Sequence, residues 1–318
     1  MLRIILSILL CFTTFQIFAK SNSVDDTAKV INRVIYITLD GVRWQDIYVK
    51  PDFHDFVSTH SDIVKEYGFP KTNQLMTVAS KPKSLPSYQS QMAGFVQPCK
   101  TNYCGRIHVE TLPEYLRTKL KVSIKDIAIF ASWENIDFAA EHISGSVFIN
   151  AGNMPVYDPD TKVADDVMQD LNLQQLNAGE SSRKVRYDIF TFQQALHYFE
   201  KYQPKFLWIS LGDADHAAHL NDAEGYEAAL SLYEDSLSQL FHKLKEMNIF
   251  ETTLVIITTD HGRGNGKFWR FHGLPIPASQ RTWAFVINGE LQPVYDRNSF
   301  KHYSTLSMRP TIEKAFKV

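Results

Sequence analysis

The sequence has little of what marks several classes of protein. Its 318 residues carry a formal net charge of only -2, which predicts neither nucleic-acid binding nor attraction to acidic membranes. Beyond residue 20, no apolar run is long enough to span a bilayer, so we expect no membrane span in the mature chain. Internal repeats and low-complexity tracts are also missing. With 44% apolar and 13% aromatic residues, the composition is that of an ordinary globular protein with a substantial core.

The first 20 residues differ in character from the rest of the chain. Arg3 gives a positive start, residues 4–18 are mainly apolar, and Ala19 offers a small residue before a cleavage point. The stretch is short and interrupted by polar residues, so we interpret residues 1–20 as a signal peptide and residues 21–318 as a single domain. We therefore expect an exported protein, periplasmic or secreted.

Cysteine is scarce, with three residues in the whole chain. Cys11 would be lost with the signal peptide, which leaves Cys99 and Cys104. In an exported protein, two cysteines with a four-residue gap can close a small loop as a disulfide. Two free thiols are the alternative, and metal binding by two ligands without nearby partners is only weakly supported.

Apolar runs alternate along the chain with segments of helical periodicity. Strands are expected at residues 34–39, 124–130, 206–212, 253–259 and 282–287. Helices are expected at residues 54–67, 85–93, 112–120, 190–202, 225–247 and 311–316. Residues 158–186 are polar, and we interpret them as an excursion with a helix near 163–173. Strands that alternate with helices predict an α/β fold, with a mainly parallel central sheet sandwiched between helical layers.

Three of the apolar runs end on acidic or imidazole side chains. Residues 253–259 are followed by Asp260 and His261, and His272 comes after a short polar loop. Residues 34–39 stop on Asp40, and residues 206–212 are followed by Asp213, Asp215, His216 and His219. Because open α/β sheets bind ligands at the carboxyl ends of their strands, we expect these side chains to converge at one edge of the sheet.

The spacing of these side chains suits metal ions. Asp215 and His219, four residues apart, would lie on one face of a helix that begins near Asp215, whereas His216 would point elsewhere. Taken alone, Asp215 and Asp260 could cap helices, and the histidines could be ordinary loop residues. Together with the ligands at the first strand end, however, the oxygen and nitrogen atoms suit two zinc-like ions.

A serine lies at an expected loop-to-helix junction. Ser84 precedes residues 85–93, where free backbone amides and the helix dipole favour an oxyanion. Two divalent ions can hold the attacking and leaving oxygens of an in-line displacement, and coordination would lower the pKa of a hydroxyl. Alone, Ser84 would be an N-cap or turn residue, but beside two ions it is a candidate nucleophile.

Two further features have open interpretations. Arg263, Lys267 and Arg270 could contact a substrate anion or form a solvated basic loop. Trp133 could stack on a leaving group, or it could pack in the core or at the rim of a site.

In this order, the motifs resemble the alkaline phosphatase superfamily, and in particular its type I phosphodiesterase/nucleotide pyrophosphatase-like branch. The residues that carry the resemblance are Asp40-Gly41, Lys83-Ser84-Leu85-Pro86, Asp215 with His219, Asp260-His261-Gly262 and His272-Gly273. They extend over nearly all of the mature chain. Each motif is weakly specific alone, but five in sequence are specific.

The resemblance implies a role for each of these residues. One ion would be held by Asp40, Ser84, Asp260 and His261. The other, which activates the water that hydrolyses a phosphoserine intermediate, would be held by Asp215, His219 and His272. Ser84 would also be the nucleophile, and Asn102 stands about where related phosphodiesterases bind a non-bridging phosphate oxygen. The implied cofactors are two divalent metal ions, with zinc preferred.

The sequence departs from the family pattern in two places. The phosphodiesterases commonly have threonine followed by Phe-Pro-Asn, whereas here Ser84 is followed by Leu85-Pro86-Ser87. The formylglycine sulfatases need an arginine four residues after the modified position, and Tyr88 stands there. We therefore predict an enzyme that hydrolyses small-molecule phosphoesters, either phosphodiesterase/nucleotide pyrophosphatase-like or a phosphomonoesterase. The alternatives are a phosphonate or sulfate ester hydrolase of the same superfamily, and a non-catalytic exported protein that binds metal or anions.

Overall fold

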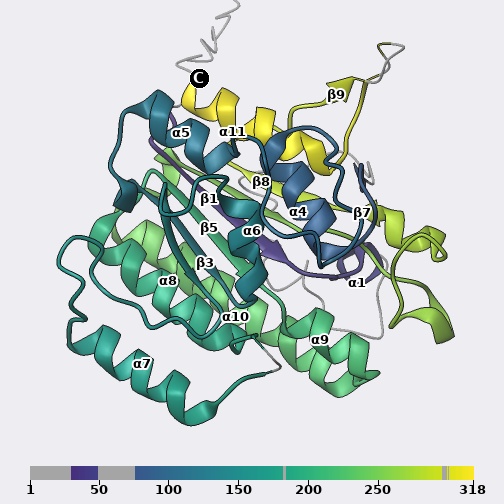
Figure 1. Cartoon of the computed structure of the whole chain (residues 1–318), viewed down its shortest axis with the longest axis horizontal. Coiled ribbons are helices and arrows are strands. Elements are labelled where there is room, and N and C mark those ends of the chain that lie inside the picture. The colour runs from purple at the N-terminus through teal and green to yellow at the C-terminus, as the bar shows by residue number, and fades with distance from the viewer. Residues whose placement is uncertain (1–29, 49–75, 182–183, 296–298, 300) are drawn as a thin grey trace, which may run out of the picture.

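The structure is a computed structural model that describes residues 30–48, 76–181, 184–295, 299 and 301–318 (Figure 1). The expected signal peptide at residues 1–20 and the expected helix at residues 54–67 lie outside the described residues. The division into a signal peptide and one domain therefore stays a prediction. Among the described residues, none of the helices is both long and apolar enough to cross a membrane.

A six-stranded sheet in the order β4-β3-β5-β1-β6-β8 forms the centre of the fold. Five of its strands are parallel: β1 (Arg33–Leu39), β3 (Ile127–Ala131), β4 (Phe148–Ala151), β5 (Phe206–Leu211) and β6 (Thr253–Thr258). Every residue of β1, β5 and β6 is buried, which explains why these strands appear as apolar runs without alternation. The last strand, β8 (Ala284–Ile287), runs antiparallel to β6, so the sheet is mixed with a mainly parallel core.

Helices cover both faces of the sheet (Figure 1). One face packs against α8 (Asp188–Tyr202) and α10 (Ala223–Glu246). The other packs against α4 (Ser84–Ala93), α5 (Leu112–Leu120) and α11 (Met308–Phe316). This arrangement confirms the expected α/β fold with helical layers on either side of the sheet.

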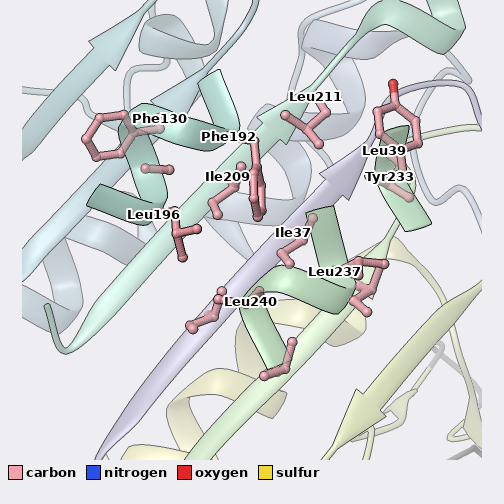
Figure 2. Packing of buried hydrophobic residues seen from close by; sticks show 14 of the residues in the cluster. Ile37, Leu39, Phe130, Phe192, Leu196, Ile209, Leu211, Tyr233, Leu237 and Leu240 are labelled. Carbon is pink, nitrogen blue, oxygen red and sulfur yellow. The ribbon is translucent and has the colours of Figure 1, made fainter. Parts of the chain in front are cut away.

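Alternate residues of β1 supply the two cores. Ile35, Ile37 and Leu39 belong to the core under α8 and α10, whereas Val34 and Tyr36 belong to the core on the other face. Figure 2 shows the first core, where side chains of β1 and β5 meet those of α8 and α10. Full burial of each such aliphatic side chain contributes about 1.5–3 kcal/mol, so β1 is fixed in the sheet from both sides.

Shorter elements join these layers. Within the described residues, the remaining helices are α1 (Trp44–Tyr48), α6 (Asp137–Ala140), α7 (Asp166–Ala178) and α9 (Asp213–Leu220). Two small strand pairs lie outside the main sheet: β2 (Met76–Thr77) with β7 (Arg281–Thr282), and β9 (Val294–Tyr295) with β10 (Lys301–His302). Short 3-10 turns are η1 (Ile124–Asp126), η2 (Glu134–Ile136), η3 (Phe250–Thr252), η4 (Gly266–Phe268), η5 (Pro277–Gln280) and η6 (Thr305–Ser307).

Some expected boundaries were wrong, and local hydrogen bonds explain two of them. The strand expected from residue 124 begins at 127, because the Ser123 amide donates to Asp126 Oδ2 at 2.9 Å and closes the turn η1. The helix expected near 163–173 begins at 166, because Asp165 caps it by accepting from the Met168 amide at 2.9 Å. The strand expected at 282–287 is divided between β7 and β8, and β4 was not predicted. The other expected elements among the described residues agree to within three residues.

The parallel register places three strand ends together. Thr38 of β1 lies opposite Ser210 of β5 on one side and Thr258 of β6 on the other. The residues that follow these strands, among them Asp40 and Asp260, therefore leave the sheet at the same edge. This edge is where the predicted site lies.

Candidate active site

Asp40, Asp260 and His261 form a buried group at the ends of β1 and β6. His261 Nε2 lies 3.3 Å from Asp260 Oδ2 and 3.7 Å from Asp40 Oδ1. The Gly41 amide donates to Asp260 Oδ1 at 3.1 Å, which ties the two strand ends together. Asp40 and Asp260 therefore converge at this edge, as expected.

The second expected group, Asp215, His219 and His272, lies beside the first. Asp215 and His219 lie on one face of α9, with His219 Nε2 3.1 Å from Asp215 Oδ2. His272 Nε2 lies 3.1 Å from His219 Nε2. The rings of His261 and His272 stack with centroids 4.0 Å apart, so the two groups share a border.

The hydrogen bonds of two histidines fix the direction of their lone pairs. His272 Nδ1 lies 2.9 Å from the Pro82 carbonyl, and His261 Nδ1 lies 3.1 Å from the Gly262 carbonyl. A carbonyl oxygen only accepts, so Nδ1 of each ring must carry the hydrogen. In the neutral ring, Nε2 then presents a lone pair, and both Nε2 atoms point into the ligand group.

The ligand atoms face one another without a hydrogen between them, which suits a bound cation. Burial lowers the pKa of His261 to about 4 and that of His272 to about 3, so both rings are neutral near pH 7. Asp260 Oδ2 and His261 Nε2 are buried and have no hydrogen-bond partner among the described residues. A lone pair that faces a carboxylate oxygen is unfavourable unless a positive ion lies between them.

The described residues contain two sets of three ligand atoms that could each hold a metal ion, with the atoms of a set within 4.8 Å of one another. One set comprises Asp40, Asp260 and His261, and the other comprises Asp215, His261 and His272. His219 contacts Asp215 and His272 from the exposed side. The donor types, carboxylate and imidazole, are those that zinc prefers.

Three neighbouring carboxylates create an electrostatic cost that a metal would relieve. Burial, together with Asp260 and Asp215, raises the pKa of Asp40 well above its usual value. Burial and the charge of Asp215 raise the pKa of Asp260 to about 6. Both shifts mean that the charged form is disfavoured without a positive partner, as expected for metal ligands.

Arg263 differs from both interpretations made from the sequence. The side chain is fully buried, so it is not part of a solvated loop. Its guanidinium forms an ion pair with Asp215 Oδ1, and Nη1 donates to the Arg270 carbonyl at 2.6 Å. Burial raises the pKa of Asp215, but Arg263 and His219 outweigh it, so that pKa lies well below its usual value. Arg263 thus holds Asp215 as an anion.

Ser84 is the first residue of α4 and is buried next to the first ligand group. Its hydroxyl donates to Asp40 Oδ1 at 3.5 Å. The same helix supports the ligands, because Ser87 Oγ donates to the Asp260 carbonyl at 2.7 Å and Tyr88 donates to Asp40 Oδ2 at 3.3 Å. The candidate nucleophile and the candidate ligands are therefore fixed to one another by α4.

Asn102 lies beside Ser84. Its side-chain Oδ1 accepts from the Leu85 amide at 3.1 Å, in the first turn of α4. The loop that carries Asn102 is closed by a disulfide between Cys99 and Cys104, the pairing that the sequence left open. Because Asn102 Oδ1 faces α4, its Nδ2 group points away from that helix.

A cavity of about 240 Å³ opens in front of Ser84. Its lining residues come from six separate segments of the chain: Asp40, Ser84, Asn102, Trp133, Val185, Gly212, Asp215, His216 and His219. Of these, His216 was not predicted as a site residue. As expected, it belongs to neither ligand set, but it lines the cavity, and no spacing rule singles it out.

Asp213 follows β5 at the same edge of the sheet, but it has a different role from the ligands. Its Oδ2 accepts from the Asp188 amide at 3.0 Å, and its Oδ1 accepts from Ser181 Oγ at 3.2 Å. Asp213 therefore caps the start of α8 and does not belong to either ligand set.

A family model described as type I phosphodiesterase / nucleotide pyrophosphatase matches residues 102–272, more than half of the chain. The chain belongs to this family. The matched segment of the phosphodiesterase family includes Asn102, Asp215, Asp260 and His272, whereas Ser84 lies before it. A comparison with curated proteins gives no match. Membership makes the protein a phosphoester hydrolase of the alkaline phosphatase superfamily, as the sequence motifs predicted.

Solved structures share the fold at low sequence identity. The lipoteichoic acid synthase LtaP from Listeria monocytogenes matches 92% of this chain and 73% of its own, with 16% identity and a TM-score of 0.58. A 2-O GAG sulfatase matches 91% of this chain and 71% of its own, with 10% identity and a TM-score of 0.55. A mutant TAB5 alkaline phosphatase matches 91% of this chain and 99% of its own, with 14% identity and a TM-score of 0.51. These likenesses concern the fold alone, and they confirm an alkaline phosphatase-like architecture.

Proposed function

We propose that this phosphodiesterase-family protein hydrolyses phosphoesters through a phosphoserine intermediate on Ser84, with two divalent metal ions as cofactors. The observation that carries the proposal is the placement of one buried hydroxyl, Ser84 Oγ, 3.5 Å from Asp40 Oδ1 and so next to the first ligand group. A protein that only bound metal would not need a hydroxyl at this position. The small cavity in front of Ser84 suits a small-molecule ester.

The proposed ligand sets follow the resemblance and the contacts. One ion would be held by Asp40, Ser84, Asp260 and His261. The other would be held by Asp215, His219 and His272. When bound, the ions would lower the pKa of the attacking hydroxyl and offset the charge of the phosphoryl oxygens. Zinc is the metal we propose, because the ligands combine imidazole and carboxylate.

The chain's own groups orient the reaction. The hydroxyl of Ser84 donates to Asp40 Oδ1, which holds Oγ in place and is positioned to receive its proton. As the bond from Oγ to phosphorus forms, the bond to the leaving alcohol breaks, and water later cleaves the phosphoserine to release the second product. Asn102 would donate from Nδ2 to a non-bridging oxygen, because its Oδ1 is engaged by the Leu85 amide.

Export of the protein is part of the proposal. The apolar start of the chain supports a signal peptide, and the disulfide between Cys99 and Cys104 suits an oxidising compartment such as the periplasm or the extracellular space.

The test is hydrolysis of a panel of nitrophenyl esters: p-nitrophenyl phosphate, bis-p-nitrophenyl phosphate, a nitrophenyl phosphonate and p-nitrophenyl sulfate. We expect turnover of a phosphate ester that chelator removes and zinc restores. Ser84→Ala should lower turnover at least a thousandfold. The control is Ser90→Ala, which removes a buried hydroxyl from the same helix that bonds only to backbone, at the Pro86 carbonyl and the Gln97 amide. Unchanged turnover by Ser84→Ala would rule out Ser84 as the nucleophile. Turnover of the sulfate or phosphonate ester alone would favour a sulfate or phosphonate ester hydrolase.

A further inference from the structure

Helix α9 carries Asp215, His216 and His219, yet its first turn has no capping side chain of its own. Gly212 stands at the N-cap position and offers no side-chain acceptor. The first amides of a helix need acceptors from elsewhere, and in a half-buried position these must come from protein. The position of two candidate ligands therefore depends on what those amides bind.

The acceptors come from two residues on other helices. Asp188, the first residue of α8, accepts from the Gly212 amide at 2.8 Å and from the Asp213 amide at 2.7 Å. Tyr233, on α10, accepts from the Ala214 amide at 3.1 Å. The Tyr233 hydroxyl in turn donates to Asp188 Oδ2 at 2.7 Å. Three consecutive amides at the start of α9 are thus held by one pair of side chains.

This pair is rigidly fixed. Asp188 and Tyr233 are both fully buried. Ser132 Oγ donates to Asp188 Oδ1, and the Asp188 amide donates back to Asp213 Oδ2 at 3.0 Å. The starts of α8 and α9 therefore cap each other, and a small movement of this joint would move α9 as a body.

The two proposed ions depend on α9 to different extents. The set with Asp215 and His219 takes two ligands from this helix, whereas Asp40, Asp260 and His261 come from the ends of β1 and β6. We propose that Asp188 and Tyr233 are positioning residues for the ion held by Asp215, His219 and His272, and not for the other ion. This inference rests on the proposed function, because it needs the metal ions.

Two matched tyrosine substitutions test the proposal. Tyr233→Phe removes one buried hydroxyl that bonds to the start of α9. Tyr198→Phe removes another fully buried hydroxyl, which donates to the Lys125 carbonyl at 2.9 Å before β3, at the opposite end of the sheet from the site. Asp188→Asn is the stronger variant, and Tyr233→Phe keeps the test usable if Asp188→Asn does not fold.

The measurement is equilibrium dialysis of the full chain against buffered free zinc, with thermal unfolding as a check on folding. We expect Tyr233→Phe to weaken one of two zinc-binding steps about tenfold and to leave the other within twofold. Asp188→Asn should weaken the same step further. Tyr198→Phe should change neither step, although we expect it, like Tyr233→Phe, to lower the melting temperature.

Two results would contradict the inference in different ways. If Tyr233→Phe binds both ions as the unsubstituted protein does, or loses both in equal measure, the positioning role is wrong and the proposed function stands. If the unsubstituted protein binds no zinc at all, the metal part of the proposed function is wrong, and the inference is wrong with it.

Discussion

The amide of Leu85 donates to Asn102 Oδ1 at 3.1 Å, which joins the first turn of α4 to the disulfide-closed loop between Cys99 and Cys104. This bond uses the acceptor of the Asn102 side chain and leaves the donor Nδ2 available. It therefore gives a small loop, distant from the metal ligands in sequence, a fixed position next to Ser84.

Replacement of Asn102 should affect the reaction more than the fold. We expect Asn102→Ala to lower kcat/KM for a phosphate diester about 10- to 100-fold, because a hydrogen bond to a charged oxygen is worth about 1.5–3 kcal/mol. Tyr103→Ala, at a side chain that is 96% exposed in the same loop, is the control and should leave kcat/KM unchanged. Steady-state kinetics of both variants provide the measurement. An Asn102→Ala enzyme with the original kcat/KM would exclude a phosphate contact.

Gly41 has no room for a side chain. Its φ is +64°, and a Cβ atom there would lie 2.5 Å from Asp215 Oδ1 and 2.8 Å from Arg263 Nε. We expect Gly41→Ala to lower the free energy of unfolding by about 2–4 kcal/mol, from backbone strain together with the clash. Gly145 has a similar φ of +80°, but a Cβ atom there would have nothing within 4 Å. Gly145→Ala should therefore lower the free energy of unfolding by only about 1 kcal/mol. Urea denaturation compares the two, and equal losses would mean that crowding at Gly41 is relieved without cost.

Gly41 and Asp40 also illustrate what the sequence could predict. An apolar run that stops on Asp-Gly identifies both the strand and the residue at its end, because the buried parallel strand needs a continuous apolar stretch. The same reasoning found Asp260, His261 and the spacing of Asp215 with His219. Each of these predictions depended on local order along the chain.

Residues whose position depends on packing between distant segments were not predicted. Arg263 was assigned to a solvated or substrate-facing loop, but folding buries it against Asp215. Asp213 follows a strand, as Asp40 does, yet it caps the start of α8, and no pattern in the sequence indicated this role. Strand β4 is only four residues long, too short for its periodicity to be distinguished from a loop.

His216 lines the cavity in front of Ser84 and belongs to neither ligand set. We expect His216→Ala to raise KM for bis-p-nitrophenyl phosphate about three- to tenfold with little change in kcat, because a residue lining the cavity would contact the ester's organic group. His216→Gln, which keeps hydrogen-bonding capacity, should restore part of the loss. His108→Ala, at an exposed site, is the control. A fall in kcat at constant KM would instead indicate a role in the chemical step.

Asp165 predicts how the stability of the helical layer depends on pH. It caps α7 and accepts from Lys201 Nζ at 2.8 Å, while His197 Nε2 lies 3.0 Å away. Burial raises the pKa of Asp165, but hydrogen bonds from Lys201, the Met168 amide and His197 outweigh it and hold that pKa below the usual value. A carboxyl with a lowered pKa in the folded state adds stability above its unfolded value of about 4, and this stability is lost as the pH falls below that value.

We therefore expect Asp165→Asn to lower the free energy of unfolding by about 0.5–1 kcal/mol at pH 7, since asparagine keeps the helix cap but loses the ion pairs. At pH 3, where the unfolded carboxyl is already protonated, the difference between variant and original should shrink. The measurement is urea denaturation at both values of pH. Asp166→Asn, which removes the same charge from an exposed position one residue along, is the control and should show a smaller difference at pH 7. A loss in Asp165→Asn that is the same at pH 3 and pH 7 would show that the cap, and not the charge, supplies the stability.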